Sequence, residues 1–426
     1  MVAFYTLRSV MFILSFVLED WALHELIPNV RERTRAIALV ASSYVTWTFQ
    51  THTFSNSIET LLVLWCIVLM RRIRENREST MASACIGLAF MGVLGIFNRI
   101  TFPAFLIIPS IQMVPQLFVR SLRIPLLLIT ALITLLVAIT IDTEIYAGTR
   151  PHLRNLLDTS IITPWNNLNY NLDPANLAEH GLHPYWQHFA ANLPQLLGPA
   201  FPLLLTARTN SLFWTAILGI ATLSCFQHQE ARFLLPAVPL LLTCIRIPTR
   251  FTRLWLTTWI LFNATLGLLF GTYHQAGILP AQSFLPSQEN VGTIYWWKTY
   301  SPPLWTSAPP TNITSIGLKT EDLMGLPESE ITSKLFNRAK CEVDVATRGQ
   351  KRTLLVAPWS ATFLDKYIER PGQKKQIATI RLRELWRTGR HVGLDDLDFA
   401  EDGILETVKR VLGRRGLVVW EVVKKC

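Results

Sequence analysis

Charged residues are scarce in this sequence. Asp, Glu, Lys and Arg together make up only 16% of its 426 residues, whereas hydrophobic residues make up 50%. The apolar residues come in long blocks and not in the alternating patterns of amphipathic helices and strands. This composition excludes an ordinary water-soluble domain and indicates a protein that crosses a membrane several times.

Several functional motifs are also missing. No CxxC pair or His/Cys cluster has the spacing of a zinc site, and there is no internal repeat or low-complexity tract. The net charge of +10 does not indicate nucleic-acid binding, because no basic stripe is interleaved with aromatic residues. Four of the six cysteines lie in apolar runs, where a free thiol behaves as a small buried hydrophobe. Cys341 and Cys426, in the polar tail, could form a disulfide, and the sequence leaves this open.

The apolar blocks predict membrane-spanning helices. A helix needs about 20 apolar residues to cross the bilayer, and shorter runs suffice where polar ends extend them. By this length criterion we place spans near residues 4–18, 36–50, 54–70, 82–98, 101–118, 124–141, 189–206, 211–226, 233–246 and 254–272. The first run is followed by Glu19 and Asp20 and has no small-residue cleavage site, so we interpret it as a span and not as a cleaved signal.

The connections between the spans predict the topology. Basic residues in alternate connections mark the cytosolic side by the positive-inside rule. They are Arg31, Arg33, Arg35, Arg71, Arg72, Arg74, Arg77, Arg120, Arg123, Arg208, Arg246, Arg250 and Arg253. The luminal side then receives both ends of the chain, a long loop at 142–188, the segment 227–232 and everything after Tyr273. Asn312, in an N-I-T sequon, is therefore predicted to be luminal, whereas Asn263 lies inside a span.

The composition from Tyr273 onward is that of a soluble domain. A proline-rich linker at 302–310 precedes it. Strands are expected at 352–358 and 416–423 and a helix at 404–413. The sequence thus predicts a mainly α fold, with a multi-span helical bundle over residues 1–272 and a luminal linker and small α/β domain over 273–426.

Ionisable residues interrupt the apolar blocks at a few positions on the luminal side. Residues 226–236 read F-Q-H-Q-E-A-R-F-L-L-P, which places His228, Glu230 and Arg232 between two apolar runs. A charge at the centre of a bilayer costs a few kcal/mol, so these groups must lie at a membrane surface or line a polar cavity. Asp142 directly follows a predicted span, and Arg99 lies between two others.

Carboxylates, imidazoles and guanidiniums that converge at a lipid boundary suit one kind of chemistry. In it, a hydroxyl attacks a membrane-embedded donor that is linked through phosphate. A carboxylate can take the proton of the hydroxyl as a general base, while Arg and His stabilise the charge that grows on the departing phosphate.

Each of these residues also has an interpretation without function. The residues at 228–232 could form a hydrogen-bonded cluster that only connects two helices. Asp142 could be a solvated charge at a helix end. Arg99 could extend its guanidinium to the lipid headgroups. Asn56 and Glu59 have the spacing of a capping box, which explains both residues structurally. The acidic run at 395–402 lacks the spacing of a calcium loop and is interpreted as a solvated face.

The segment H-Q-E-A-R-F resembles the His-Lys/Gln-Glu-x-Arg-Phe element of glycosyltransferase family 22. These enzymes are dolichol-phosphate-mannose-dependent mannosyltransferases with the GT-C fold. Longer stretches are similar to the fungal branch of the family that adds the fourth, side-branching mannose to the GPI anchor precursor in the endoplasmic reticulum. They lie at 41–65, 97–105 (F-N-R-I-T-F-P-A-F), 167–184, 192–199 (N-L-P-Q-L-L-G-P) and 360–367 (S-A-T-F-L-D-K-Y).

The resemblance implies an inverting transfer of mannose from dolichol phosphate mannose to a hydroxyl of the third GPI mannose, with an α-1,2 bond formed. No metal or other cofactor is implied. The partners are the lipid-linked donor, the GPI lipid acceptor and the endoplasmic reticulum membrane. Carried over by position, the substrate-binding residues are Arg99, Asp142, His228, Glu230 and Arg232.

The sequence departs from the family at its start. Family members carry a His-Pro-Asp-Glu-like luminal segment whose acid is the presumed base, and this sequence has no such segment. We therefore expect the chain to be truncated at its N-terminus and inactive as it stands, with Asp142 as the candidate base within it. Two alternatives stay open, namely a mannosyltransferase acting on an N-glycan lipid-linked oligosaccharide and a transporter, which would require inverted repeats and broken helices.

Overall fold

The computed structural model describes residues 2–75, 81–119, 122–148, 160–173, 176, 182–303, 319–341, 351–369, 380–394, 397 and 403–424. They form two compact units. The helical unit comprises Thr6–Gly267, and the C-terminal unit comprises Leu268–Cys426 together with Met1–Tyr5. Composition changes at Tyr273, whereas the contacts divide the chain between Gly267 and Leu268.

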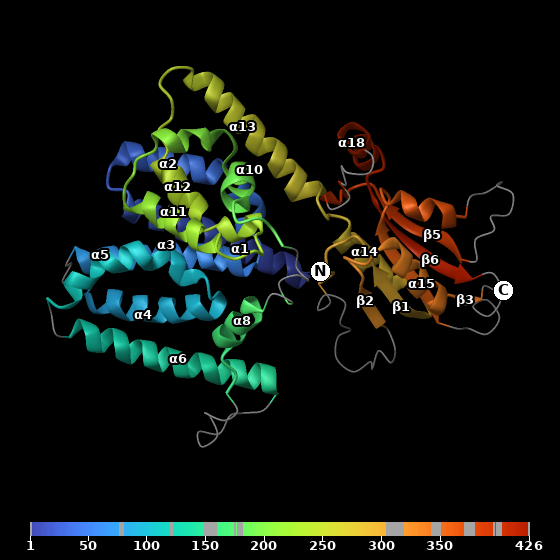
Figure 1. Cartoon of the computed structure of the whole chain (residues 1–426), viewed down its shortest axis with the longest axis horizontal. Helices are drawn as coiled ribbons and strands as arrows, with labels where there is room; N and C mark the ends of the chain where they lie inside the picture. The colour runs from blue at the N-terminus through green and yellow to red at the C-terminus, as the bar shows by residue number, and fades with distance from the viewer. Residues whose placement is uncertain are drawn as a thin grey trace. The chain divides into compact units, whose positions relative to one another are not determined.

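The helical unit is built from helices of very different lengths (Figure 1). Its α-helices are α1 (Val2–Leu26), α2 (Val30–Ser42), α3 (Ser55–Arg74), α4 (Met81–Asn98), α5 (Ile107–Leu117), α6 (Arg123–Ala147), α8 (Thr163–Leu172), α10 (Leu193–Leu197), α11 (Ser211–Leu223), α12 (Ala237–Cys244) and α13 (Thr252–Leu268). Within the described residues, four helical stretches are long and apolar enough to cross a membrane: Val2–Leu26, Met81–Asn98, Arg123–Ala147 and Thr252–Tyr273. The chain is a multi-pass membrane protein.

Several of the predicted spans are not continuous helices: α2 ends at Ser42, within the span at 36–50, and a 3₁₀ turn at Phe102–Leu106 opens the span at 101–118. Residues 189–206 contain a π-helical turn at His188–Asn192, the short α10 and two 3₁₀ turns at Gly198–Ala200 and Pro202–Thr206. Three prolines fall in this segment, and each lacks the N–H that would continue an α-helical hydrogen-bond ladder. Residues 233–246 contain only the eight-residue α12. Hydropathy located these apolar segments, and in the last two the proline pattern determines that they fold as short pieces.

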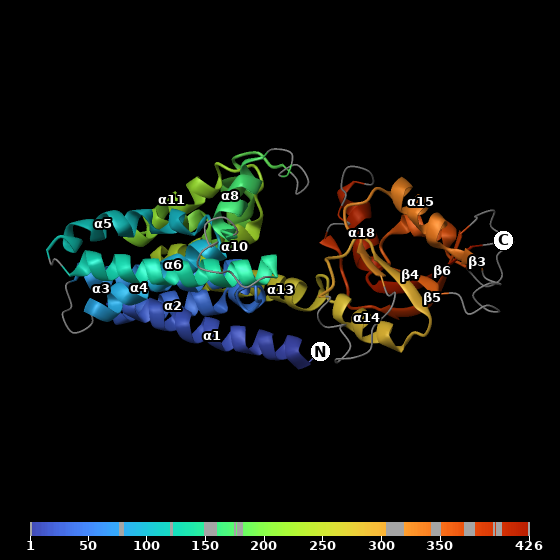
Figure 2. The same cartoon turned by 90° about the horizontal axis from the view of Figure 1, so that it is seen from below.

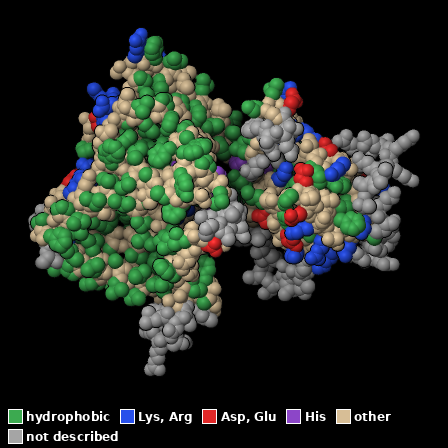
Figure 3. All heavy atoms as spheres, viewed as in Figure 1, with side chains coloured by type: hydrophobic (Ala, Val, Ile, Leu, Met, Phe, Trp, Pro, Cys, Tyr) green, Lys and Arg blue, Asp and Glu red, His purple; other side chains and the backbone are tan. Residues whose placement is uncertain are grey.

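Helix α3 is the centre of the helical unit. It packs against α4 and α5, and most of its side chains are buried, including Val63, Leu64 and Cys66. Helix α6 packs on α4 from the outside (Figure 2), and none of its most apolar stretch is buried by protein. Apolar side chains cover much of the visible face of the helical unit in Figure 3, as expected for a surface that faces lipid.

The C-terminal unit contains a six-stranded mixed sheet. The strands are β1 (Val291–Trp296), β2 (Lys319–Asp322), β3 (Lys340–Cys341), β4 (Arg352–Pro358), β5 (Ile380–Thr388) and β6 (Leu417–Lys424). The strand order is β2-β1-β4-β6-β3, and β5 also pairs with β6. Strands β1, β2 and β4 are parallel, whereas β6 is antiparallel to both β4 and β5. The predicted strands at 352–358 and 416–423 and the predicted helix at 404–413, which is α18 (Ile404–Gly413), are confirmed.

The sheet of the C-terminal unit is buried on both faces. On one face, Trp297, Leu355 and Trp420 pack with α15 (Glu328–Arg338). On the other, Trp296 and Leu417 pack with α14 (Ile278–Phe284). Three other predictions concern residues after Tyr273. Cys341 is disulfide-bonded, while Cys426, most of the acidic run 395–402 and the sequon at Asn312 lie outside the described residues.

Candidate functional site

A buried ion pair joins two helices at one end of the helical unit. Oε2 of Glu59, in the first turns of α3, lies 2.9 Å from Nε of Arg99, directly after α4. Only 1% of the Glu59 side chain is exposed. Thr101 donates a hydrogen bond of 3.4 Å to Oε1 of Glu59, and Arg99 donates through Nη1 to Ser55 at 3.4 Å. Arg99 is thus held on the bundle by α3.

The segment with His228, Glu230 and Arg232 forms a second charged pair. Arg232 approaches the Glu230 carboxylate with Nε and Nη2, and the Nη2 contact measures 3.0 Å. Nε2 of His228 lies 3.1 Å from Oε1 of the same carboxylate. These residues stand in the turn between α11 and α12, where Pro236 and the short 3₁₀ turn Ala231–Leu234 delay the start of α12. The carboxylate therefore orients both an imidazole and a guanidinium.

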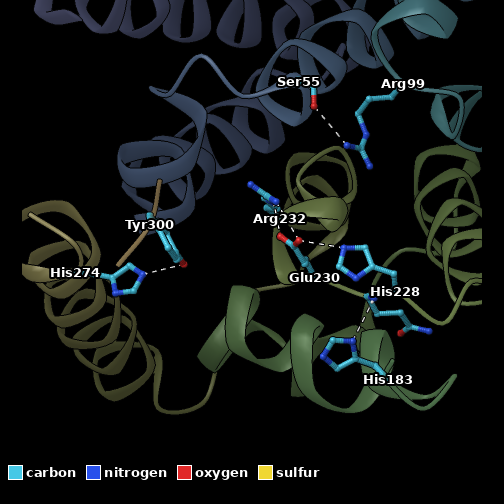
Figure 4. Close-up of polar contacts among 9 residues, drawn as sticks. Ser55, Arg99, His183, His228, Glu230, Arg232, His274 and Tyr300 are labelled. Atoms are coloured by element: carbon cyan, nitrogen blue, oxygen red, sulfur yellow. Dashed lines mark hydrogen bonds and ion pairs between the residues drawn. The ribbon is translucent and has the colours of Figure 1, made fainter. Parts of the chain in front are cut away.

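Phe233 connects the two pairs. The guanidinium carbon of Arg99 lies 4.8 Å from the centroid of its ring, and the His228 ring lies 5.4 Å from it, edge to face. Figure 4 shows Arg99, His228, Glu230 and Arg232 gathered in one region. Segments that are far apart in the sequence therefore build one cluster.

The electrostatics of Glu230 are set by its neighbours. Burial alone would raise the pKa of this carboxyl, but the hydrogen bond from His228 and the positive charge of Arg232 outweigh burial and lower the pKa to about 2. Glu230 is therefore ionised at every physiological pH.

The loop before α3 borders the cluster. The guanidinium of Arg232 lies 5.7 Å from the centroid of the Phe54 ring, which stacks on the ring of His52 at 4.6 Å. Nδ1 of His52 lies 3.0 Å from Nη1 of Arg8 on α1. Burial and the nearby Arg8 charge lower the pKa of His52 to about 3, so its imidazole is neutral. Residues from α1 thus reach the rim of the cluster.

His183 and His188 contact the turn between α11 and α12. The backbone N–H of His183 donates to the carbonyl of Gln227 at 2.8 Å, and the His183 and His228 rings lie 6.5 Å apart. The side chain of Gln229 accepts from the His188 N–H at 2.9 Å and donates to the carbonyl of Phe226, also at 2.9 Å. The polar loop around 168–184 therefore meets the cluster through its last residues.

Asp142 is not joined to this cluster by any contact among the described residues. It lies inside α6, which continues to Ala147, and not directly after a helix as the sequence suggested. Its Oδ2 atom is buried and has no hydrogen-bond partner in the described part of the chain.

Sequence reasoning missed two members of the site. Glu59 was explained by a capping box with Asn56, and this is wrong. Helix α3 begins at Ser55 and its N-cap position is Phe54, so Asn56 is inside the helix and Glu59 pairs with Arg99 instead. Phe233, the ring between the pairs, was noted as the last residue of the H-Q-E-A-R-F element but was given no role in the site. A buried acid in a predicted span was the available signal for Glu59.

The cluster can bind an anion. Arg232 uses Nε and Nη2 for Glu230, and Arg99 uses Nε and Nη1 for Glu59 and Ser55, among the described residues. A guanidinium carries five N–H donors in a rigid fork, so each arginine retains donors for a phosphate. Each is also fixed in place by a carboxylate, which lowers the entropy cost of binding.

Comparison with known proteins identifies the family. Residues 1–309 match the profile of the Alg9-like mannosyltransferase family. The chain belongs to this family. As an Alg9-like mannosyltransferase it is a glycosyltransferase, which confirms the class of enzyme that the H-Q-E-A-R-F segment predicted.

Fungi contain relatives of this Alg9-like mannosyltransferase. It is 45% identical to GPI mannosyltransferase 4 of Aspergillus oryzae, over 98% of this chain and 82% of the relative. It is 44% identical to GPI mannosyltransferase 4 of Emericella nidulans, over 98% and 81%, and 34% identical to that of Yarrowia lipolytica, over 99% and 83%. No solved structure matches the chain.

Proposed function

We propose that this chain transfers mannose from dolichol phosphate mannose to the third mannose of the GPI anchor precursor, at the endoplasmic reticulum membrane. The names of the relatives support this acceptor over an N-glycan oligosaccharide, and the family supports an enzyme over a transporter. We also propose a GT-C arrangement for the helical unit. The observation that carries the proposal is the cluster in which carboxylates fix Arg99 and Arg232 at one end of the bundle.

In the proposed reaction a hydroxyl oxygen of the acceptor mannose forms a bond to the anomeric carbon of the donor. The bond from that carbon to the phosphate oxygen breaks, and dolichol phosphate leaves with the electron pair. The configuration at the carbon inverts because attack and departure are on opposite faces. Arg99 and Arg232 stabilise the charge on the departing phosphate, a role typically worth about 10²- to 10³-fold in rate. Asp142 is the candidate within this chain to take the hydroxyl proton.

We propose that this chemistry proceeds without a metal cofactor. The positive charge that a leaving phosphate requires comes from the two guanidiniums. Activity that persists in excess EDTA would support this part of the proposal. Loss of activity in EDTA and its recovery on adding Mg²⁺ or Mn²⁺ would contradict it.

The test of the acceptor uses cells that lack their own fourth-mannose activity. Two proteins are expressed, namely this chain and the same chain joined to those parts of the Aspergillus oryzae relative that the alignment does not cover. Lipid extracts are then examined for GPI precursors with three and four mannoses. We expect the four-mannose precursor to return with the joined protein, which is also the protein for all the transfer measurements proposed below. If both proteins accumulate in the membrane and only the three-mannose precursor is found, the proposed acceptor is wrong.

A further inference from the structure

Helix α8 runs across the ends of the long helices of the helical unit. In Figures 1 and 2, α4 and α6 lie side by side, and α8 crosses their direction near the end of α4. The chain before α8 is fixed to α6, because the N–H of Ile161 donates to Oγ1 of Thr143 at 3.0 Å. Because α4 and α6 are long enough to cross a membrane, a helix that crosses their direction near one end has the orientation expected of a helix along the membrane plane.

The sequence of α8 has two different faces. It reads T-P-W-N-N-L-N-Y-N-L and contains no charged residue. Trp165, Leu168 and Leu172 recur at helical spacing and share one face, while Asn167 and Tyr170 lie on the opposite side and Asn171 borders Leu168. Within the described residues Trp165 and Leu172 are not covered by protein, since they are 60% and 62% exposed, whereas Leu168 at the edge of this face is partly buried.

The uncovered face continues a surface that already faces lipid. Most side chains in the apolar stretch of α6 are exposed or only partly buried, and at its end Ile145 and Tyr146 are exposed. The same loop returns to the bundle through Tyr185 and Trp186, and both are exposed. Trp and Tyr are enriched where membrane meets water, because an apolar ring and a polar N–H or O–H suit the two sides of that boundary.

We propose that α8 is an interfacial helix that lies in the headgroup region of the bilayer, with Trp165 and Leu172 inserted toward the acyl chains. The partner is the lipid surface of the leaflet at the end of the bundle that carries the candidate site. A second protein fits less well, because the face extends the lipid-facing surface of α6 and the helix has no charge to select a partner. This inference does not depend on the proposed reaction.

The experiment places a spin label on each face of α8 in the full chain. Cys225, the exposed free cysteine of the described residues, is first replaced by serine. Trp165→Cys then reports the apolar face, and Asn167→Cys is the matched control on the polar face. Both proteins are reconstituted in phosphatidylcholine vesicles, and collisions of the label with oxygen and with a water-soluble nickel chelate are compared. The Cys225→Ser protein alone measures background labelling.

We expect the label at 165 to collide several-fold more with oxygen than with nickel, and the label at 167 to show the reverse. Because Trp165→Cys removes one of the anchors, Leu172→Cys provides a second measurement with Trp165 in place. Nickel access at both 165 and 172 equal to that at 167 would overturn the proposal, since the apolar face would then be in water. Shielding of 165 and 172 from both reagents would also overturn it, since protein would then cover the face.

Discussion

The Glu59 carboxylate holds the Arg99 guanidinium at 2.9 Å from a position on α3 that is almost completely inaccessible to solvent. A second pair, Arg72 and Glu25 at 3.1 Å, joins α3 to α1 near the opposite end of α3. Both pairs connect helices, and only the first contacts the ring of Phe233 and so belongs to the candidate site. The two can therefore be compared directly.

Replacing Glu59 should affect both stability and activity. Removing one partner of a buried pair typically costs about 3–5 kcal/mol, because the other charge is left uncompensated. We expect Glu59→Gln to lower the melting temperature and to reduce transfer at least about tenfold, through a misplaced Arg99. Glu59→Asp should recover part of both. The control is Glu25→Gln, which should lower stability without a specific loss of activity, and equal activities in the two Gln variants would contradict a role for Glu59 in the site.

Arg232 should matter for rate more than for stability. It is partly exposed, and exposed pairs contribute little to folding. We expect Arg232→Ala to reduce transfer about 10²- to 10³-fold at nearly normal abundance, and Arg232→Lys to recover little because the two-pronged contact with Glu230 is lost. Arg208→Ala is the matched control, since Arg208 pairs with Glu32 at a similar exposure and lies outside the cluster. Similar activities of the two Ala variants would remove Arg232 from the site.

Asp142 has a sharper test because a near neighbour serves as its control. If it takes the acceptor proton, Asp142→Asn should lower the rate about 10²- to 10⁴-fold while donor binding is kept. Glu144, two residues further along α6, is exposed, and Glu144→Gln should be almost neutral. An active Asp142→Asn protein would show that the base is another group.

The C-terminal unit should lose stability in weak acid. Burial and the nearby His274 lower the pKa of His391 to about 4, and Nδ1 of His391 accepts a hydrogen bond from the Gly277 N–H at 3.3 Å. The imidazole of His391 is therefore protonated near pH 6.5 in the unfolded chain, but only near pH 4 in the folded chain. Stability is full above pH 6.5 and falls by up to about 3 kcal/mol as the pH drops to 4.

Thermal unfolding of the full chain between pH 7.5 and 4, followed by the protease resistance of the C-terminal unit, measures this loss. His391→Gln removes the titrating group. Its stability should vary less with pH than that of the unaltered chain. Identical pH profiles for the two proteins would show that His391 is not responsible.

Topology can be tested at Asn312, which lies outside the described residues. Positive-inside counting places residues after Tyr273 in the lumen, so the N-I-T sequon is predicted to carry a glycan. Endoglycosidase should increase the gel mobility of the chain, and Asn312→Gln should abolish the shift. Asn263→Gln should leave the shift unchanged, because Asn263 is buried in α13 and accepts a hydrogen bond from the Tyr44 N–H at 2.7 Å. Labelling of a cysteine introduced near residue 390 from the cytosolic side would contradict this topology.

The sequence predicted those features that depend on neighbouring residues. Hydropathy identified the long helices, and short continuous apolar runs identified β4 and β6. Hydropathy placed the end of a span just before Asp142. The residues that follow are compatible with a helix, and α6 continues through them to Ala147. The cluster at 228–232 was visible because its residues are consecutive, whereas the pairing of Glu59 with Arg99 is tertiary. A local explanation for Glu59 was available, and it was the wrong one.

Strand β6 has a consequence for biosynthesis. Residues 417–424 pair with β4, β5 and β3, so the sheet of the C-terminal unit has its middle strand at the end of the described chain. Until the ribosome has released these residues, β4 and β5 have no partner between them, and their apolar side chains are exposed to chaperones. A frameshift or stop codon between β5 and β6 should therefore be as damaging as loss of the whole unit, and quality control should degrade the product.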